Sequence, residues 1–290
     1  MEWGELIGYT SVFLAWQHGS KTKQPAAIQS PTRRRIRNPM KPVTISVVSH
    51  NQMHLVANLL QDLNKHCAPV VKRIVLTYNV AGEKPLGRFP DRIPVVEIRN
   101  AQVAGFGANH NRAFEHCDTE WFLVINPDVR LSSDVISRLL ARKRPGTGLL
   151  APQETDASGA PRDHPRSLIT PWSLLARRLL RRQECAPHRL AWVKGMFMLM
   201  PSRVFRSVGG FDERYVLYCE DFDLCARMIL KGWTVDHHPD IALHHAWQRD
   251  SGHSLLHLGH HLASLLRMWS SDAFWQYRRL LRQAPIEKSR

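Results

Sequence analysis

The chain contains no long apolar run, and none of its stretches approaches the roughly 20 residues that a membrane-spanning helix needs. The N-terminal run Val12–Trp16 is short, and the acids Glu2 and Glu5 precede it. We therefore expect neither a spanning helix nor a signal peptide. Cysteine is also scarce, with five residues and no CxxC pair, which excludes a disulfide-based scaffold and favours a reducing, cytoplasmic compartment.

Acidic residues are few, because 25 Asp and Glu face 40 Lys and Arg, and the net charge is +15. Such a balance predicts an anionic partner, for which nucleic acid, anionic lipid and a nucleotide diphosphate all qualify. One basic cluster, Arg278–Arg282, lies in an apolar, helix-like segment with interfacial aromatics such as Trp269 and Trp275. That segment is typical of a membrane-surface helix, but also of a solvated helix that packs on the domain through its leucines.

The few acids are not spread evenly. After the double glycine Gly209–Gly210, five of them fall within twelve residues: Asp212, Glu213, Glu220, Asp221 and Asp223. A further acidic element, Asn126–Asp128, directly follows the apolar run Trp121–Ile125. Carboxylates gathered in a basic chain indicate general-base chemistry or a metal site. Together they suggest an enzyme that handles a metal-bound phosphate ester.

Alternating strand and helix patterns predict an α/β fold with a mainly parallel central sheet flanked by helices. We expect a poorly ordered basic extension over residues 1–42, a catalytic domain over 43–254 and an amphipathic basic helical segment over 255–290. The expected strands are Val43–Val48, Arg73–Thr77, Val95–Ile98, Trp121–Ile125 and Trp192–Met200, and the expected helices include Ala108–His116, Trp172–Arg182 and Asp221–Lys231. Ser132 or Ser133 is expected to cap a further helix.

Ligands of such sheets bind beyond the carboxyl ends of the strands. Polar residues gather at those ends in this sequence. They are Ser49, His50, Asn51, Tyr78, Asn79, Asn100 and Asn126–Asp128.

The ordered set of motifs resembles the family-2 glycosyltransferases, particularly the bacterial branch with rhamnosyltransferase-like enzymes. The motifs that carry the resemblance are Ser46–Asn51, Asn100, Gly105–Asn111, Asn126–Asp128, Trp192–Gly195, Gly209–Glu213, Glu220–Asp221 and His244. The resemblance spans about Val43 to Ser254 and implies a GT-A-type nucleotide-diphospho-sugar domain that inverts the anomeric centre.

The resemblance implies a divalent cation, Mn²⁺ or Mg²⁺, at the position of the family's Asp-x-Asp motif. There Asp128 would bind the cation that bridges the two donor phosphates, and His244 would complete its shell. Only Asp128 of Asn126–Asp128 is acidic, and an Asn-Pro turn is the ordinary structural alternative. His245 adjoins His244, so the register of the histidine stays open.

The same resemblance assigns Asp221 as the general base and Glu220 as the residue that orients or tunes it. Trp192 and Gly195 would lie on the acceptor side. The donor-binding set would be Ser49, Asn51, Tyr78, Asn79, Asn100, Gly105, Gly107, Asn111 and Asn126. Relatives often have an aspartate before the asparagine after the second strand, where this chain has Tyr78, so Tyr78 would stack on the base and Asn79 would hydrogen-bond it.

The resemblance thus implies an enzyme that moves a sugar, such as the deoxyhexose rhamnose, from a nucleotide diphosphate to a glycan or lipid-linked acceptor in cell-surface polysaccharide assembly. It would work in the cytoplasm, at the inner face of the membrane, with no nucleic-acid partner. A non-catalytic nucleotide-sugar-binding module is the alternative that Asn126 and Tyr78 leave open. A nucleic-acid-binding protein fits the charge but not the acids at the expected site, and a nucleotidyltransferase would need a Gly-rich loop after the first strand.

Overall fold

In the computed structural model, the central sheet lies between two apolar layers, and successive side chains of its strands point alternately into one layer and the other. Along β4 (Trp121–Ile125), Trp121, Leu123 and Ile125 are buried in one layer, while Phe122 and Val124 are buried in the other. This period of two is what a strand buried on both faces requires. The structure describes residues 41–85, 87, 92–156, 158–162, 168, 170–171, 192–245 and 255–283, all within the unit Pro39–Arg290.

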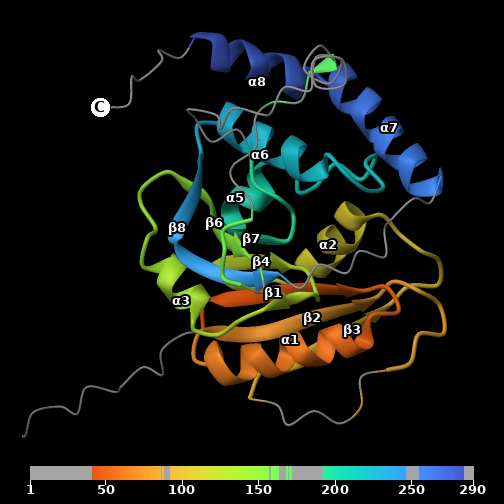
Figure 1. Cartoon of the computed structure of the whole chain (residues 1–290), viewed down its shortest axis with the longest axis vertical. Coiled ribbons are helices and arrows are strands. Elements are labelled where there is room, and N and C mark those ends of the chain that lie inside the picture. The colour runs from red at the N-terminus through yellow and green to blue at the C-terminus, as the bar shows by residue number, and fades with distance from the viewer. Residues whose placement is uncertain are drawn as a thin grey trace, which may run out of the picture. The chain divides into compact units, whose positions relative to one another are not determined.

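The strands form one eight-stranded sheet in the order β3-β2-β1-β4-β7-β6-β8-β5 (Figure 1). The other strands are β1 (Val43–Ser49), β2 (Val71–Tyr78), β3 (Val95–Arg99), β5 (Val129–Arg130), β6 (Thr147–Thr155), β7 (Phe197–Pro201) and β8 (Thr234–His245). Four neighbouring pairs are parallel (β1 with β2, β2 with β3, β1 with β4, β6 with β8), and the other three are antiparallel. The predicted α/β class is confirmed.

Helices cover both faces of the sheet. Those on one face are α1 (Met53–His66) and α3 (Val135–Leu140), and those on the other are α2 (Phe106–Phe114), α5 (Ser202–Ser207) and α6 (Glu220–Leu230). The spacing of Leu55, Leu59, Leu60 and Leu63 in the sequence predicts an apolar stripe on one helical face, and all four side chains of α1 are buried. The N-cap of α3 is Asp134, whose side chain accepts from the Ser137 N–H (2.9 Å), and not Ser132 or Ser133 as predicted.

The C-terminal segment consists of two helices, α7 (Leu255–Ser270) and α8 (Asp272–Gln283). The α8 side chains Phe274 and Tyr277 are buried against Phe222 of α6, with ring centroids 6.0 and 5.9 Å away. The segment is therefore part of the second apolar layer rather than an appendage. Within the described residues, no helix is both long enough and apolar enough to cross a membrane.

Two predicted elements have different bounds in the structure, and two other predicted segments lie outside the described residues. The strand expected over Trp192–Met200 begins only at Phe197, because residues 195–196 form a turn. Helix α2 begins at Phe106, two residues before the predicted start. The predicted helix Trp172–Arg182 and the first 40 residues of the predicted extension lie outside the described residues.

Candidate functional site

Two adjoining cavities lie where the parallel strands end. The larger of the two, which we call the strand-end cavity, has a volume of about 620 Å³ and is bordered by residues that follow β1, β2, β3 and β4. The other, the acid cavity, measures about 320 Å³ and is bordered by Trp192–Met196, Leu217–Phe222 and residues of α7. Phe106, Asn126 and Leu217 border both. Asp128 borders the strand-end cavity and Asp221 borders the acid cavity, so the two predicted aspartates do lie at connected sites.

A chain of charged side chains runs behind Asp128. His245, at the end of β8, donates through Nε2 to Asp128 Oδ2 (2.9 Å) and through Nδ1 to Glu154 Oε1 (2.8 Å). Glu154 Oε2 in turn accepts from Lys194 Nζ (2.9 Å). Burial alone would lower the pKa of His245, but its hydrogen bonds to the two carboxylates outweigh this and raise the pKa to about 9. The imidazolium thus neutralises part of the charge of both acids.

The histidine that meets Asp128 is His245 and not the predicted His244. Successive side chains of a strand point to opposite faces. Val129 and Arg130 of β5 pair with His245 and His244, respectively. One residue of register therefore decides which imidazole reaches the cavity side, and the sequence alone left that register open.

The residues around Asp128 fit a divalent cation that arrives with a diphosphate. Asp128 Oδ1 is buried and has no hydrogen-bond partner. Carboxylate oxygen and imidazole nitrogen together suit Mn²⁺. Among the described residues, no group of three or more His, Cys, Asp or Glu side chains could hold a metal ion by itself. A cation here would be held by Asp128 and by His245 after loss of its proton, with phosphate oxygens as the remaining ligands.

Asp221 lies at the start of α6 and is fixed by backbone amides. Its Oδ2 accepts from the Gly195 N–H (3.1 Å) and its Oδ1 from the Phe222 N–H (2.8 Å). The two residues before Glu220, Tyr218 and Cys219, have φ of 73° and 66°, a left-handed conformation that costs free energy outside glycine. The backbone is thus bent at the point where the helix presents its first two acids.

Glu220 is protonated in the same environment at neutral pH. Burial, followed by the charge of Asp221, raises the pKa of Glu220 to about 8. Its Oε2 is buried without a hydrogen-bond partner. Two neighbouring carboxyl groups that cannot both ionise divide their roles, as in other acid pairs. Here Asp221 carries the negative charge of the pair.

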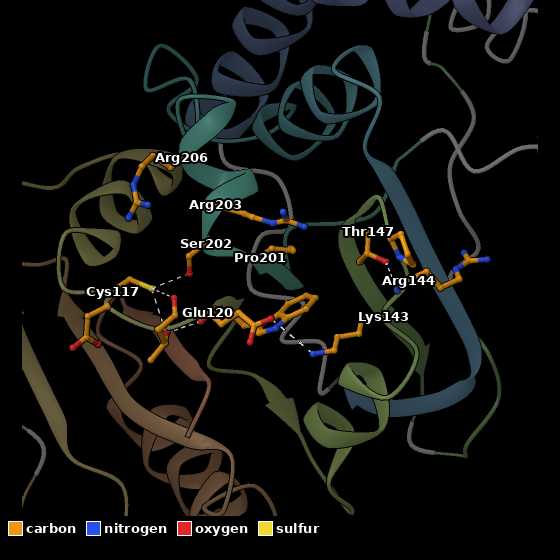
Figure 2. A pocket seen from close by; sticks show the side chains of 13 residues that line it. Cys117, Glu120, Lys143, Arg144, Thr147, Pro201, Ser202, Arg203 and Arg206 are labelled. Atoms are coloured by element: carbon orange, nitrogen blue, oxygen red, sulfur yellow. Dashed lines mark hydrogen bonds and ion pairs between the residues drawn. The ribbon is translucent and has the colours of Figure 1, made fainter. Parts of the chain in front are cut away.

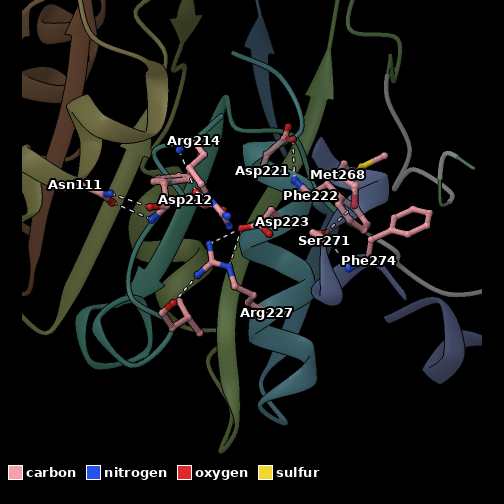
Figure 3. A network of polar contacts seen from close by, with 12 residues as sticks. Asn111, Asp212, Arg214, Asp221, Phe222, Asp223, Arg227, Met268, Ser271 and Phe274 are labelled. Atoms are coloured by element: carbon pink, nitrogen blue, oxygen red, sulfur yellow. Dashed lines mark hydrogen bonds and ion pairs between the residues drawn. The ribbon is translucent and has the colours of Figure 1, made fainter. Parts of the chain in front are cut away.

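The other three acids of the predicted cluster hold the local fold together, and Figure 3 shows two of them, Asp212 and Asp223, with their arginine partners. Asp212 pairs with Arg214 (2.6 Å), and Asp223 pairs with Arg227 one helical turn away (2.7 Å). Glu213 accepts from Asn111 Nδ2 (2.9 Å). The acids of the segment therefore fall into two groups. Asp212, Glu213 and Asp223 stabilise the local structure, and only Glu220 and Asp221 border the acid cavity.

The predicted acceptor-side residues do lie at the acid cavity. Trp192 borders it, although the side chain is largely buried and meets Phe222 edge-on, with ring centroids 6.4 Å apart. Gly195 lies against Phe106, whose Cζ would be 3.1 Å from an added Cβ. Its contribution is to bring a backbone N–H to Asp221, which the resemblance did not suggest.

Two of the five predicted donor-binding asparagines, Asn79 and Asn100, bind each other. Asn100 Nδ2 donates to Asn79 Oδ1 (2.9 Å) and to Asn109 Oδ1 (2.7 Å). Asn79 Oδ1 also accepts from the Ala104 N–H (2.9 Å), and Asn79 Nδ2 donates to the Ala104 oxygen (3.0 Å). This network shapes the wall of the strand-end cavity, so the amide of Asn79 is committed to the protein rather than to a base.

Tyr78 is not placed to stack on a base. Its side chain is buried, Arg99 lies over its ring at 4.1 Å, and its hydroxyl donates to Glu97 Oε1 (2.8 Å). Ser49 is likewise buried and donates to Glu83. Asn51, with φ of 60°, is exposed at the turn after β1. Of the donor-binding set, Asn79 and Asn126 border the strand-end cavity.

Gly105, Gly107 and Asn111 serve helix packing. A Cβ at Gly105 would lie 2.9 Å from the Val216 oxygen, and one at Gly107 would lie 2.7 Å from Phe211 Cβ. Asn111 binds both the N–H and the oxygen of Phe211 (2.9 Å each). The glycines therefore let α2 approach the segment 211–216, whereas the resemblance had assigned them to donor binding.

A still larger cavity, about 770 Å³, lies at the opposite edge of the sheet, beside the starts of β4 and β6 and the end of β7 (Figure 2). It contains several basic side chains, but these already have partners. Lys143 faces Glu120 (3.8 Å) and Arg144 pairs with Asp236 (2.9 Å), while Arg203 lies over Trp233. Volume alone therefore does not identify the functional site, whereas the acids Asp128 and Asp221 at the two smaller cavities do.

Sequence reasoning missed Glu154 and Phe106. Glu154 is a buried acid at the end of β6, and it connects His245 to Lys194. The signal available was a lone glutamate closing the apolar run Thr147–Gln153. Phe106, which separates the two cavities, stands between the two glycines of the recognised motif.

Comparisons with known proteins agree with this picture. No protein-family model matches the chain. The chain is 30% identical over 197 residues to N-acetylglucosaminyl-diphospho-decaprenol L-rhamnosyltransferase of Mycobacterium tuberculosis, covering 61% of this chain and 64% of that protein. It is 26% identical over 226 residues to the Escherichia coli rhamnosyltransferase WbbL, covering 70% and 83%. The predicted resemblance to rhamnosyltransferases is confirmed, over a little less than two thirds of the mycobacterial protein.

Solved structures show the fold. The mannosyltransferase PcManGT of Pyrobaculum calidifontis, solved with GDP-Man and Mn²⁺, matches with a TM-score of 0.56 at 15% identity, covering 84% of this chain and 70% of that one. GalNAc-T7, solved with UDP, GalNAc and Mn²⁺, matches with a TM-score of 0.61 at 15% identity, covering 86% and 52%. These likenesses confirm the predicted GT-A architecture.

Proposed function

Because the chain is rhamnosyltransferase-like in sequence and has the GT-A fold, we propose that it is an inverting, metal-dependent glycosyltransferase. It transfers a deoxyhexose such as rhamnose from a nucleotide diphosphate to a hydroxyl of a lipid-linked glycan, at the cytoplasmic face of the membrane, in cell-surface polysaccharide assembly. The observation that carries the proposal is the pair of adjoining cavities, one bordered by Asp128 and the other by Asp221.

We assign a role to each side of the site on the basis of the residues that border the two cavities. The donor occupies the strand-end cavity with its diphosphate toward Asp128 and His245. The acceptor enters the acid cavity, where its hydroxyl meets Asp221. Phe106 and Asn126, which border both cavities, lie where the anomeric carbon would pass from one substrate to the other.

Asp221 acts as the general base in one displacement. It takes the proton of the acceptor hydroxyl as that oxygen bonds to the anomeric carbon from the face opposite the diphosphate. The bond between the carbon and the diphosphate oxygen breaks, and the nucleotide diphosphate leaves with the electron pair. The amides of Gly195 and Phe222 hold Asp221 in place, and protonated Glu220 leaves the charge on Asp221. When bound at Asp128, a divalent cation would neutralise charge on the departing diphosphate.

Two measurements test the proposal. A thermal-shift screen of nucleoside diphosphates and their sugars, with and without Mn²⁺, identifies the donor, because a ligand that binds only the folded protein raises its Tm. With that donor, Asp221→Asn is expected to lower sugar transfer by about 10²- to 10⁴-fold while leaving the donor Kd within a few-fold.

The matched control is Asp272→Asn, which removes an exposed acid from α8. It should transfer sugar like the wild type. Near-native turnover by Asp221→Asn would refute the base assignment. If no nucleotide sugar raised the Tm of the wild type, the enzyme itself would be in question.

A further inference from the structure

Exposed apolar side chains are concentrated on α7 and α8 and at the edge of the strand-end cavity. Within the described residues, six large hydrophobic side chains are exposed: Val103, Val216, Leu262, Leu266, Trp275 and Leu280. Val103 and Val216 border the strand-end cavity. The other four lie on α7 and α8 and are 41–57% exposed. Single exposed hydrophobics are ordinary, but this concentration on two helices and one cavity mouth indicates an interaction surface.

Helix α7 connects that surface to the site. Its inner side is anchored, because Leu265 and Met268 are buried and Ser264 Oγ donates to the Leu217 oxygen (2.7 Å). His260 borders the strand-end cavity. His261 borders the acid cavity and meets Tyr218 edge-on, with ring centroids 5.0 Å apart.

Leu262 directly follows these two histidines, and Leu266 lies one turn further along the same face of the helix. The outer side of α7 is therefore apolar right beside both cavities, on a helix that is fixed by its inner side.

The charged side chains of α7 and α8 are mostly positive. Together α7 and α8 carry four arginines (Arg267, Arg278, Arg279 and Arg282) and a single carboxylate, Asp272. In the part of the chain that the structure describes, none of the four arginines pairs with a carboxylate. Arg278 instead lies over the ring of Trp275, 5.1 Å from its centroid. Unpaired arginines beside exposed leucine and tryptophan match the chemistry of an anionic lipid surface, which offers phosphates above an apolar layer.

We propose that the α7–α8 surface, formed by Leu262, Leu266, Trp275, Leu280 and the four arginines, docks on an anionic lipid bilayer. Docking presents the two cavities to the headgroup layer, where the reacting end of a lipid-linked acceptor lies. The inference rests on the proposed function for its biological purpose, but the docking itself is a property of the surface and can be measured without any substrate.

The test is flotation of the full-length protein with vesicles of phosphatidylglycerol and phosphatidylcholine. The wild type should float with mixed vesicles at moderate salt and remain behind with pure phosphatidylcholine. Leu262→Glu with Leu266→Glu should lower the vesicle partition coefficient at least about tenfold, since it places two carboxylates at an anionic apolar boundary. Replacing Arg278, Arg279 and Arg282 by Gln should lower binding and flatten its salt dependence.

Lys65→Glu is the matched control. It changes the net charge by the same two units on the exposed side of α1, far along the chain from the surface. It should float like the wild type, and circular dichroism and Tm should show that all variants are folded. The proposal is overturned if the wild type does not bind anionic vesicles, if the double leucine variant binds as well as the wild type, or if these leucines instead support a dimer in sedimentation.

A second readout separates this inference from the proposed function. With a short-chain, water-soluble acceptor, the double leucine variant should transfer sugar at the wild-type rate, and with a long-chain acceptor in vesicles it should be at least about tenfold slower. Vesicle binding without any transfer to either acceptor would support the docking proposal and refute the proposed glycosyltransferase function. Equal rates on both acceptors would refute the docking surface and retain the enzyme.

Discussion

The strand-end cavity and the acid cavity adjoin, yet they are built in opposite ways. Residues that follow four parallel strands line the first, and two of its asparagines, Asn79 and Asn109, accept hydrogen bonds from Asn100. The second is assembled from segments distant in sequence, among them residues 192–196, residues 217–222 and α7, and Glu220 Oε2 is buried there without a partner. A satisfied polar wall is rigid and specifies shape, while an unsatisfied buried acid costs free energy and marks chemistry. We therefore expect residues of the strand-end cavity wall to determine its shape, and the acids of the acid cavity to take part in the reaction.

After Asp221→Asn, the largest effect should come from changing Asp128, the one acid that borders the strand-end cavity. Asp128→Asn should lower transfer by about 10²- to 10³-fold, because the charge that faces the diphosphate is lost. The Mn²⁺-dependent rise in Tm with nucleoside diphosphate should disappear as well. Asp118→Asn, in the cavity at the opposite strand ends, breaks only exposed ion pairs and should leave both readouts unchanged. A persisting metal-dependent shift in Asp128→Asn would contradict the assignment.

The junction between the cavities should be the next most sensitive. In Gly107→Ala, the new Cβ would lie 2.7 Å from Phe211 Cβ, so α2 and the segment behind Glu220 would have to separate. We expect a loss of about 1–3 kcal/mol in urea unfolding. The KM values for donor and acceptor should both rise.

Gly259→Ala in α7, where an added Cβ meets nothing within 4 Å, is the control and should be neutral or slightly stabilising. If Gly107→Ala raised only one of the two KM values, the cavities would be less connected than the packing indicates.

The buried acid gives the comparison a pH dependence. The pKa of Glu220 is about 8 in the folded protein, against 4.5 as its ordinary value. Between these values the folded state keeps a proton that the unfolded state loses, so the free energy of unfolding falls as pH rises. Glu220→Gln should remove that decline, and its advantage over the wild type in urea unfolding should grow from pH 5 to pH 8. Parallel curves for the two proteins would show that Glu220 is ionised at neutral pH.

The smallest effect should come from the satisfied wall. Tyr78→Phe removes one hydrogen bond to Glu97 and should cost about 1 kcal/mol of stability. The donor KM should stay within twofold of the wild type, because the ring is buried under Arg99. A tenfold rise in the donor KM, or an altered preference among nucleotide bases, would show that Tyr78 does contact the base of the donor.

Local patterns predicted the first half of the fold well. The run Trp121–Ile125 is a strand with the predicted bounds, and the leucines of α1 face the core as their spacing indicates. Here a residue's neighbours in sequence are also its neighbours in structure. The motif Glu220–Asp221 was found for the same reason, since both acids lie in one helical turn.

What could not be predicted depends on pairing between distant strands. The choice of His245 over His244 follows from the register of β8 against β5 and β6, which no local pattern contains. Glu154 acquires its role only when β6 lies beside β8. The function assigned to Gly105 and Gly107 changed because Phe211 and Val216, a hundred residues later, fill the space beside them.

The hydrogen bond from the Phe106 N–H to the Val216 oxygen (2.9 Å) joins α2 to the loop that leads from the strand-end cavity into the acid cavity. A ligand that fixes the position of α2 would therefore also fix the position of the backbone that leads into Tyr218 and Cys219. Such linkage is reciprocal, so each substrate should tighten the other's binding by the same factor. Kinetically, this favours ordered addition, with the nucleotide sugar entering before the alcohol it will glycosylate.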